Sequence, residues 1–193
     1  DDLMKHFDER APYSSQMGQT LATLKDNHIF MEAILGARAP EQVTGTGASG
    51  LVISNDKLKL NTVVPANAQT AVELATALKA ALKEASANFK KKDVPASTKK
   101  VCYIDWDTYL TALDAVDTNG YSFFYHKGDF GQTVGVIMCQ NAVAEVMAQD
   151  ITMELGDYDV SRKGQLLTAD LFTGCGWLRP ECLVELKLVT VEV

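Results

Sequence analysis

The sequence predicts an α+β fold in which long helices come first and a run of β-strands follows. Apolar residues at spacings of three and four indicate a helix from about Ser14 to Gly36 and another that ends at residues 90–92. From Tyr121 onward, short apolar runs between turn residues are typical of strands. At 193 residues the chain can bury a core in one domain or in two interleaved ones.

For the first long helix, Ser14 or Ser15 suits the N-cap and Gly36 suits the C-cap. Pro12 is expected to interrupt a short helix before it. The apolar stripe of the long helix consists of Met17, Leu21, Leu24, His28, Met31 and Leu35, and we expect His28 to be a half-buried core histidine. Ile29 and Ile34 lie off this stripe, which indicates a broader buried face, and we expect the helix to lie against a sheet or a neighbouring subunit.

The segment Ala37–Gly50 reads as a loop and contains a G-x-G-x-x-G string, Gly45 to Gly50. A dinucleotide site would need a strand before this string and a helix after it. Here a loop precedes it and a strand, Leu51–Ser54, follows. We therefore interpret it as a flexible connection.

The middle of the chain alternates short strands with helices. After a short strand at Leu58–Val64, Asn67 or Gln69 is expected to open the second long helix. The face that this helix should bury consists of Ala71, Leu74, Leu78, Leu82, Ala85 and Phe89. A buried strand at Lys100–Ile104 and a short helix at Trp106–Val116 are predicted next.

The β part of the chain is predicted from runs and alternations of apolar residues. The strands are expected at Tyr121–Tyr125, Thr133–Cys139, Glu145–Leu155 and Gly164–Thr173, the last two forming a hairpin. A short helical turn is expected at Gln140–Ala144. In the final strand, Val184, Leu186 and Leu188 alternate with Glu185 and Lys187, which predicts one apolar and one polar face.

Between the hairpin and the final strand we predict a double-glycine bend at Gly174 and Gly176, followed by a rigid corner at Arg179–Glu181. Glycine permits positive φ where a strand changes direction, and Pro180 fixes φ before the last strand.

Composition argues against several classes of function. The net charge of −7 disfavours nucleic-acid binding through a basic face. The chain has no signal peptide and no apolar run that would span a bilayer, so we expect a cytosolic product without membrane association. The four cysteines lack C-x-x-C spacing, so we expect them to be reduced, without a disulfide framework or a zinc site: Cys102, Cys139, Cys175 and Cys182.

No constellation of residues predicts catalysis, a metal or a cofactor. Asp105, Asp107, Asp114 and Asp117 do not alternate as a calcium loop requires. The three histidines are scattered, and no serine or cysteine lies in a nucleophile elbow.

Several strings in order along the chain share one resemblance. They are Tyr13–Ala22, Val94–Leu110, Lys127–Phe130 with Asn141–Val143, and Gly174–Glu181. These strings resemble the major capsid proteins of tailed bacteriophages with the HK97 fold, and above all their T7-like podovirus branch. The sequence begins after the family's N-terminal arm and extended loop, and Gly120 to Thr133 is shorter than the matching family segment.

The resemblance implies an HK97-like fold with a long spine helix, a peripheral β-hairpin and an axial mixed α/β domain. It places residues 1–50 and 142–174 in the peripheral domain and residues 51–141 and 175–193 in the axial domain. Gly174 and Gly176 would lie where the chain crosses between them, so bulky β-branched replacements there should abolish assembly before solubility.

The implied function is mechanical: copies would assemble into the hexamers and pentamers of an icosahedral shell around double-stranded DNA. Implied partners are scaffolding and portal proteins and a decoration protein, and the implied location is the virion, after assembly in the host cytoplasm. The expected interface or hinge residues are Asp157, Asp159, Arg162, Lys163, Gly174, Gly176, Arg179 and Glu181, although solvated surface charge would explain the charged ones equally well. An encapsulin-type compartment, a monomeric α/β enzyme and a small binding module remain alternatives.

Overall fold

The computed structural model describes residues 10–41, 44–58, 70–115, 120–157 and 165–189. The chain divides into two compact units. Unit 1 contains the chain up to Ile29 together with Glu145–Cys175, and unit 2 contains Phe30–Ala144 together with the chain from Gly176 onward. The assignment of peripheral and axial roles to such units stays a prediction.

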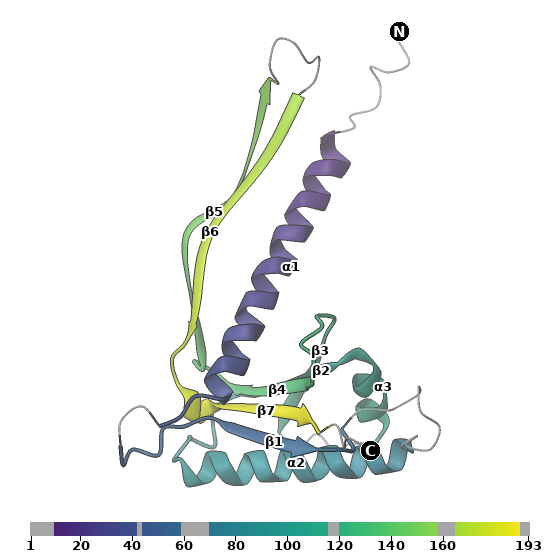
Figure 1. Ribbon diagram of the computed structural model, residues 1–193, viewed down its shortest axis with the longest axis vertical. Coiled ribbons are helices and arrows are strands. Elements are labelled where there is room, and N and C mark those ends of the chain that lie inside the picture. The colour runs from purple at the N-terminus through teal and green to yellow at the C-terminus, as the bar shows by residue number, and fades with distance from the viewer. Residues whose placement is uncertain (1–9, 42–43, 59–69, 116–119, 158–164, 190–193) are drawn as a thin grey trace. The chain divides into compact units, whose positions relative to one another are not determined.

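Unit 1 combines most of helix α1 (Arg10–Ala37) with the hairpin of β5 (Val143–Asp157) and β6 (Gln165–Trp177) (Figure 1). The hairpin was expected, and both strands are longer than the pattern predicted. At its base, Thr173 Oγ1 donates to Glu145 Oε1 at 2.7 Å, and the same carboxylate pairs with Lys25 Nζ of α1 at 2.8 Å.

Helix α1 begins at Arg10, so the predicted N-cap at Ser14 or Ser15 is wrong. Pro12 lies in the first turn and does not interrupt the helix, because the N–H groups of that turn have no intrahelical acceptor for a proline to lose. Gly36 is the penultimate residue of the helix and not its C-cap. A Cβ there would lie 2.5 Å from Leu183 Cδ1, so the glycine allows close packing.

Unit 2 is built on a five-stranded mixed sheet with the order β1-β7-β4-β2-β3. Its strands are β1 (Leu51–Asn55), β2 (Lys100–Asp105), β3 (Tyr121–His126), β4 (Thr133–Cys139) and β7 (Leu183–Leu188). The final strand pairs in parallel with β1 and antiparallel with β4, so it lies inside the sheet. Strand β4 has the predicted bounds and is buried along almost its whole length.

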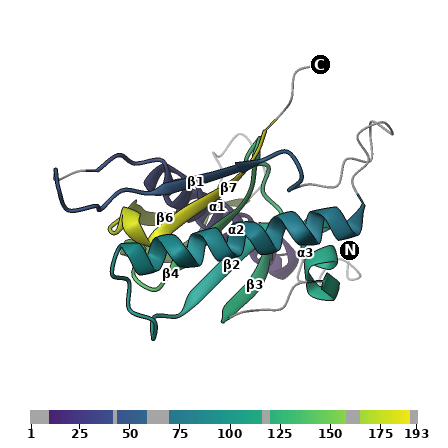
Figure 2. The ribbon, with the colours of Figure 1, turned by 90° about the horizontal axis from the view of Figure 1, so that it is seen from below.

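Helix α2 (Ala71–Lys91) covers one face of this sheet, as the view from below shows (Figure 2). Its buried residues include the predicted stripe from Leu74 to Phe89, whereas Ala71 is exposed. The N-cap is Thr70, so the predicted cap at Asn67 or Gln69 is wrong. The predicted strand Leu58–Val64 lies outside the described residues except for Leu58, which is buried.

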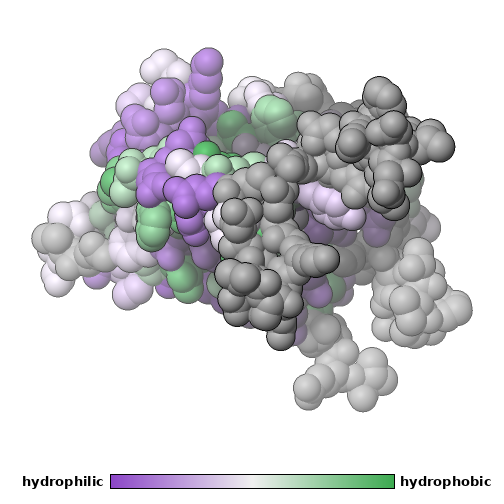
Figure 3. Space-filling view, turned by 90° about the horizontal axis from the view of Figure 1, so that it is seen from above, coloured by the Kyte–Doolittle hydropathy of each residue, from purple (hydrophilic) through white to green (hydrophobic). Residues whose placement is uncertain are grey.

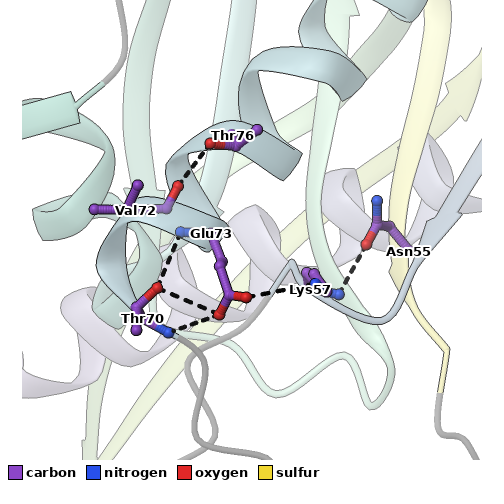
Figure 4. Close-up of polar contacts among 6 residues, drawn as sticks. All are labelled: Asn55, Lys57, Thr70, Val72, Glu73 and Thr76. Atoms are coloured by element: carbon purple, nitrogen blue, oxygen red, sulfur yellow. Dashed lines mark hydrogen bonds and ion pairs between the residues drawn. The ribbon is translucent and has the colours of Figure 1, made fainter.

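Thr70 and Glu73 form a capping box (Figure 4). The Glu73 N–H donates to Thr70 Oγ1 at 3.3 Å, and the Thr70 N–H donates to Glu73 Oε2 at 3.2 Å. Lys57 Nζ lies 3.5 Å from the same carboxylate, so the helix start is tied to the loop after β1. The T-x-x-E string is the local signal for this start.

The opposite face of the sheet is covered by the last turns of α1, which belong to unit 2 (Figure 1). Phe30 packs edge-on against Tyr103 and stacks on Phe130, with ring centroids 5.4 and 5.0 Å apart. The buried residues of α1 are Phe30, Ala33, Ile34, Gly36 and Ala37. The predicted stripe is therefore not the face that these turns bury.

Short elements complete unit 2. Helix α3 (Trp106–Ala115) follows β2 directly, and a 3₁₀ helix (Pro180–Cys182) precedes β7. The predicted helical turn Gln140–Ala144 is instead a tight turn with Asn141 at positive φ, and β5 already begins at Val143. Ala142 C=O accepts from the N–H groups of Leu178 and Arg179 at 2.9 and 3.2 Å, which holds the corner after β6.

Candidate functional site

The hairpin β5–β6 exposes large apolar side chains. They are Val146, Met147, Met153, Leu166 and Phe172. Val146 and Met147 are neighbours in one strand, so they point to opposite faces, and both faces carry apolar side chains. Within the described chain the hairpin is a separate two-stranded sheet with two outer edges. Two-stranded ribbons are marginally stable in water, and open edges are templates for pairing.

Unit 1 also contains a shallow apolar groove between α1 and β6. Its volume is about 300 Å³, and it is lined by Tyr13, Gln16, Met17, Thr20, Leu21 and Ala169. None of the described residues that line it is charged, so its chemistry suits apolar contact.

Much of the apolar stripe predicted for α1 is exposed. Leu24, Met31 and Leu35 are each about half exposed, and His28 is exposed, so the expectation of a core histidine is wrong. Apolar side chains are interspersed with hydrophilic ones on the face seen from above (Figure 3).

A third exposed apolar region lies at the β3 edge of the unit 2 sheet. Trp106 and Tyr109 of α3 surround Tyr125 of β3, with centroid distances of 4.6 and 5.6 Å to its ring. Lys127 Nζ lies 6.0 Å from the Tyr125 centroid, within cation–π range. Trp106 and Tyr125 are both exposed although they pack together.

In unit 2, a partly buried ion pair anchors the end of α1 to the sheet. Arg38 Nη2 donates to Glu185 Oε1 of β7 at 2.5 Å, and Arg38 Nε donates to Glu185 Oε2 at 2.6 Å. Thr133 Oγ1 donates to the same carboxylate at 2.6 Å. Glu185 is 0% exposed, whereas the Arg38 side chain is 47% exposed. The alternation of β7 predicted that Glu185 would face away from the core, and the sequence contains no local signal for its partner.

The ionisation of Glu185 follows from these contacts. Burial disfavours the charged carboxylate, but the hydrogen bonds from Arg38 and Thr133 outweigh this cost and lower the pKa of Glu185. The carboxylate is therefore charged at neutral pH and acts as a structural anchor.

The charged residues expected at interfaces fall into two groups. At the corner, Arg179 Nε donates to Glu181 Oε1 at 2.7 Å, so these two side chains pair with each other. Asp157 ends β5, and its side chain is outside the described part of the chain. Asp159, Arg162 and Lys163 also lie outside the described residues.

Gly174 and Gly176 lie within β6, which continues to Trp177, so the predicted bend with positive φ is wrong. Positive φ occurs instead at glycines of turns and loops, such as Gly120 and Gly131. A Cβ at either β6 glycine would meet open space. The boundary between the two units nevertheless falls between Cys175 and Gly176.

The remaining motifs carry no chemistry in the described chain. In the G-x-G-x-x-G loop, Gly45 and Gly47 have positive φ, and the Gly47 N–H donates to the carboxylate of Glu41, where a phosphate would have to bind. Among the described residues no group of three His, Cys, Asp or Glu side chains could hold a metal ion. None of the described helices is long and apolar enough to cross a membrane.

The comparisons with known proteins match capsid proteins. A family model described as "Gp10A-like: Major capsid protein" matches residues 1–129. The major capsid protein of Escherichia phage T7 is 28% identical over 127 residues, which cover 64% of this chain and 34% of that protein. The chain thus spans about a third of the length of this curated relative.

Two solved structures superpose over 99% of the chain, each with a TM-score of 0.71. One is the capsid of Cyanophage P-SCSP1u, at 22% identity and 69% of that chain. The other is the mature capsid of bacteriophage PhiM1, at 15% identity and 68% of that chain. At these identities the likeness shows the fold, and it confirms the predicted α+β, HK97-like architecture.

Proposed function

Because the chain belongs to the Gp10A-like family of major capsid proteins, we propose that it is a shell subunit that self-assembles into the hexamers and pentamers of an icosahedral phage head. The role is mechanical and includes no catalytic step. Closed shells require each copy to present surfaces that complement its neighbours, and many modest contacts then add up to a stable particle.

One observation carries the proposal on the structural side: the hairpin β5–β6 exposes apolar side chains on both faces and has two open edges. A chain that worked alone would gain nothing from this exposed apolar surface. A neighbouring copy that covered Val146, Met147 or Phe172 would remove that surface from water, which favours association by roughly 25 cal/mol per Å² before the costs of ordering.

In this proposal unit 1 serves as the peripheral domain and unit 2 as the axial domain. Asp157 ends β5, Asp159, Arg162 and Lys163 follow it before β6 begins, and all four would contact a neighbouring copy. Arg179 and Glu181 hold the corner through their own ion pair, and Leu178 beside them is exposed and available to a neighbour.

The enclosed cargo would be double-stranded DNA, held without sequence-specific contacts. The net charge of −7 supports a shell that surrounds DNA without gripping it. Scaffolding, portal and decoration proteins are proposed partners, with the virion as the location and the host cytoplasm as the place of assembly.

Negative-stain electron microscopy of the purified full-length chain tests the proposal. We expect rings, capsomers or closed shells, alone or after a matching scaffolding protein is added. A chain that stays a dispersed monomer at high concentration under both conditions would overturn it. Particles purified from the expressing cells that enclose a cargo enzyme in place of DNA would contradict the phage-head form of the proposal.

A further inference from the structure

Two buried cysteines face each other across the antiparallel pair β4–β7. The register of these strands pairs Ile137 with Val184 and Met138 with Leu183. The next step of the same register places Cys139, the last residue of β4, opposite Cys182, the residue before β7. Cys182 is 0% exposed and Cys139 is 3% exposed.

The register brings the two thiols side by side, because directly opposite residues of an antiparallel pair point to the same face of the sheet. Directly opposite residues of an antiparallel pair have Cβ atoms about 4.5–5.5 Å apart, and a disulfide needs about 3.5–4.5 Å. A small local adjustment would therefore suffice to join the sulfurs. The site is at the end of the sheet, where Cys139 pairs with Lys100 of β2 on one side and the 3₁₀ helix Pro180–Cys182 leads into β7 on the other.

The surroundings favour a thiolate on one of the two sulfurs. The hydrogen bond from Cys139 lowers the pKa of the Cys182 thiol to about 7, with Arg179 and Lys92 contributing positive charge and Glu181 opposing them. The pKa of Cys139 is raised, because its proton is the one shared and the site is buried. Cys102, by contrast, is fully buried and burial alone raises the pKa of its thiol.

We propose that Cys139 and Cys182 form an intramolecular disulfide when the protein meets a disulfide oxidant, which joins the end of β4 to the start of β7. When the end of the sheet opens locally and exposes Cys182, its thiolate attacks one sulfur of a low-molecular-weight disulfide such as oxidised glutathione and releases one glutathione thiolate. The Cys139 sulfur then attacks the Cys182 sulfur of the mixed disulfide, releases the second glutathione and gives up its proton. Two thiols lose two electrons, and one glutathione disulfide is reduced to two thiols.

The bond would close a loop that contains the whole hairpin. The chain passes from unit 2 to unit 1 after Ala144 and returns at Gly176, and both crossings lie between the two cysteines. Closing a loop of this length restricts the unfolded chain, so the oxidised protein should unfold at a higher temperature. This proposal concerns the single chain and does not depend on shell assembly.

The experiment uses the full-length protein, incubated with oxidised glutathione and then alkylated, digested and mapped by mass spectrometry. We expect a peptide pair linked through Cys139 and Cys182, a mass loss of about 2 Da before digestion, and a Tm that rises by roughly 5–15 °C and falls again with dithiothreitol. Cys139→Ser and Cys182→Ser should each abolish the linked pair, whereas Cys102→Ser and Cys175→Ser should leave it intact.

The proposal fails if both thiols are still alkylated after oxidation while the half-buried Cys175 carries the glutathione adduct. It also fails if Cys139 or Cys182 links to Cys102 or to another molecule. Because peptide mapping of the wild-type chain decides between these results, a serine variant that does not fold leaves the test intact.

Discussion

At the scale of single residues, Glu185 shows what the end of α1 contributes to the fold. A buried carboxylate is costly to hold in an apolar sheet unless it is paired and hydrogen-bonded, and Arg38 and Thr133 supply those contacts. The two partners are not equivalent, because Glu185 is fully buried and the Arg38 side chain is half exposed. Removal of Arg38 leaves the buried carboxylate of Glu185 without its partner. Removal of the Glu185 carboxylate leaves an arginine that water can solvate.

We therefore predict that Arg38→Ala costs about 3–5 kcal/mol in free energy of unfolding at pH 7, and that Glu185→Gln costs less. Chemical denaturation at constant pH measures both. Arg179→Ala is the matched control, because it removes the arginine of an exposed pair with Glu181 and should cost under about 1 kcal/mol. Equal losses in Arg38→Ala and Arg179→Ala would contradict the role of the buried pair.

The same pair predicts a dependence on pH. Since the pKa of Glu185 is lowered in the folded chain, its stabilisation is present above its ordinary pKa of 4.5 and is lost as the pH falls below that value. In Arg38→Ala the carboxylate loses its partner and burial then raises its pKa. The stability difference between this variant and the wild type should shrink as the pH falls from 7 to 4, and a difference that stayed constant would contradict the assignment.

Sequence patterns predicted the extent of strands better than the environment of individual residues. The continuous apolar run Thr133–Cys139 predicted a strand covered on both faces, and the structure confirms it. The alternation around Glu185 predicted an outward side chain, but β7 lies between β1 and β4 and is covered on both faces. Which strand becomes central depends on long-range pairing, and a local alternation does not contain that information.

At the scale of elements, the start of α2 depends on the reciprocal bonds of Thr70 and Glu73 (Figure 4). We predict that Thr70→Ala destabilises the protein by about 1 kcal/mol, because an orphan N–H of the first turn loses its acceptor. Thr76→Ala is the matched control: the Thr76 hydroxyl donates to Val72 C=O within the helix, and alanine has the higher helix propensity. Thermal unfolding should show a lower stability for Thr70→Ala than for Thr76→Ala. A larger loss of stability in Thr76→Ala would contradict the capping role of Thr70.

Two glycines within strands, Gly135 and Gly176, are predicted to respond in opposite ways to a larger side chain. A Cβ at Gly135 would clash with the Tyr103 carbonyl and lie 2.8 Å from Ile104 Cγ2, so Gly135→Ala should cost about 1–3 kcal/mol. A Cβ at Gly176 meets open space in an extended strand, so Gly176→Val should leave the stability of the folded chain unchanged. If Gly176 also serves assembly as a hinge, this variant will fold and fail to form particles, and normal particles would refute the hinge.

For α1, apolar spacing predicted the helix and left open whether a sheet or a neighbouring subunit covers its apolar stripe. The stripe through Leu24, Met31 and Leu35 has ideal helical spacing, yet the described chain buries Phe30, Ala33 and Ile34 instead. An apolar stripe indicates that a helix face avoids water, but not whether its cover comes from the same chain. In a protein that assembles with copies of itself, this difference is expected.

At the scale of the whole molecule, the two units bury their apolar side chains to different degrees. Unit 2 has a sheet covered on both faces and contains most of the buried core. Unit 1 has a two-stranded hairpin with apolar residues exposed on both faces. The pattern of apolar residues predicted this hairpin and the resemblance predicted the family, whereas the exposed apolar surface of the hairpin became visible only in the structure. Unit 2 therefore resembles a self-sufficient fold, and unit 1 is the part that a neighbour would complete.

Sedimentation velocity of the full-length chain and two glutamate variants tests this account most directly. Val146 in β5 and Val72 in α2 are each 73% exposed, so Val146→Glu and Val72→Glu add the same charge at equally accessible positions. We predict that the wild type and Val72→Glu form large particles, whereas Val146→Glu remains a folded small species with an unchanged Tm. Particles of normal size from Val146→Glu would contradict the claim that the hairpin drives assembly.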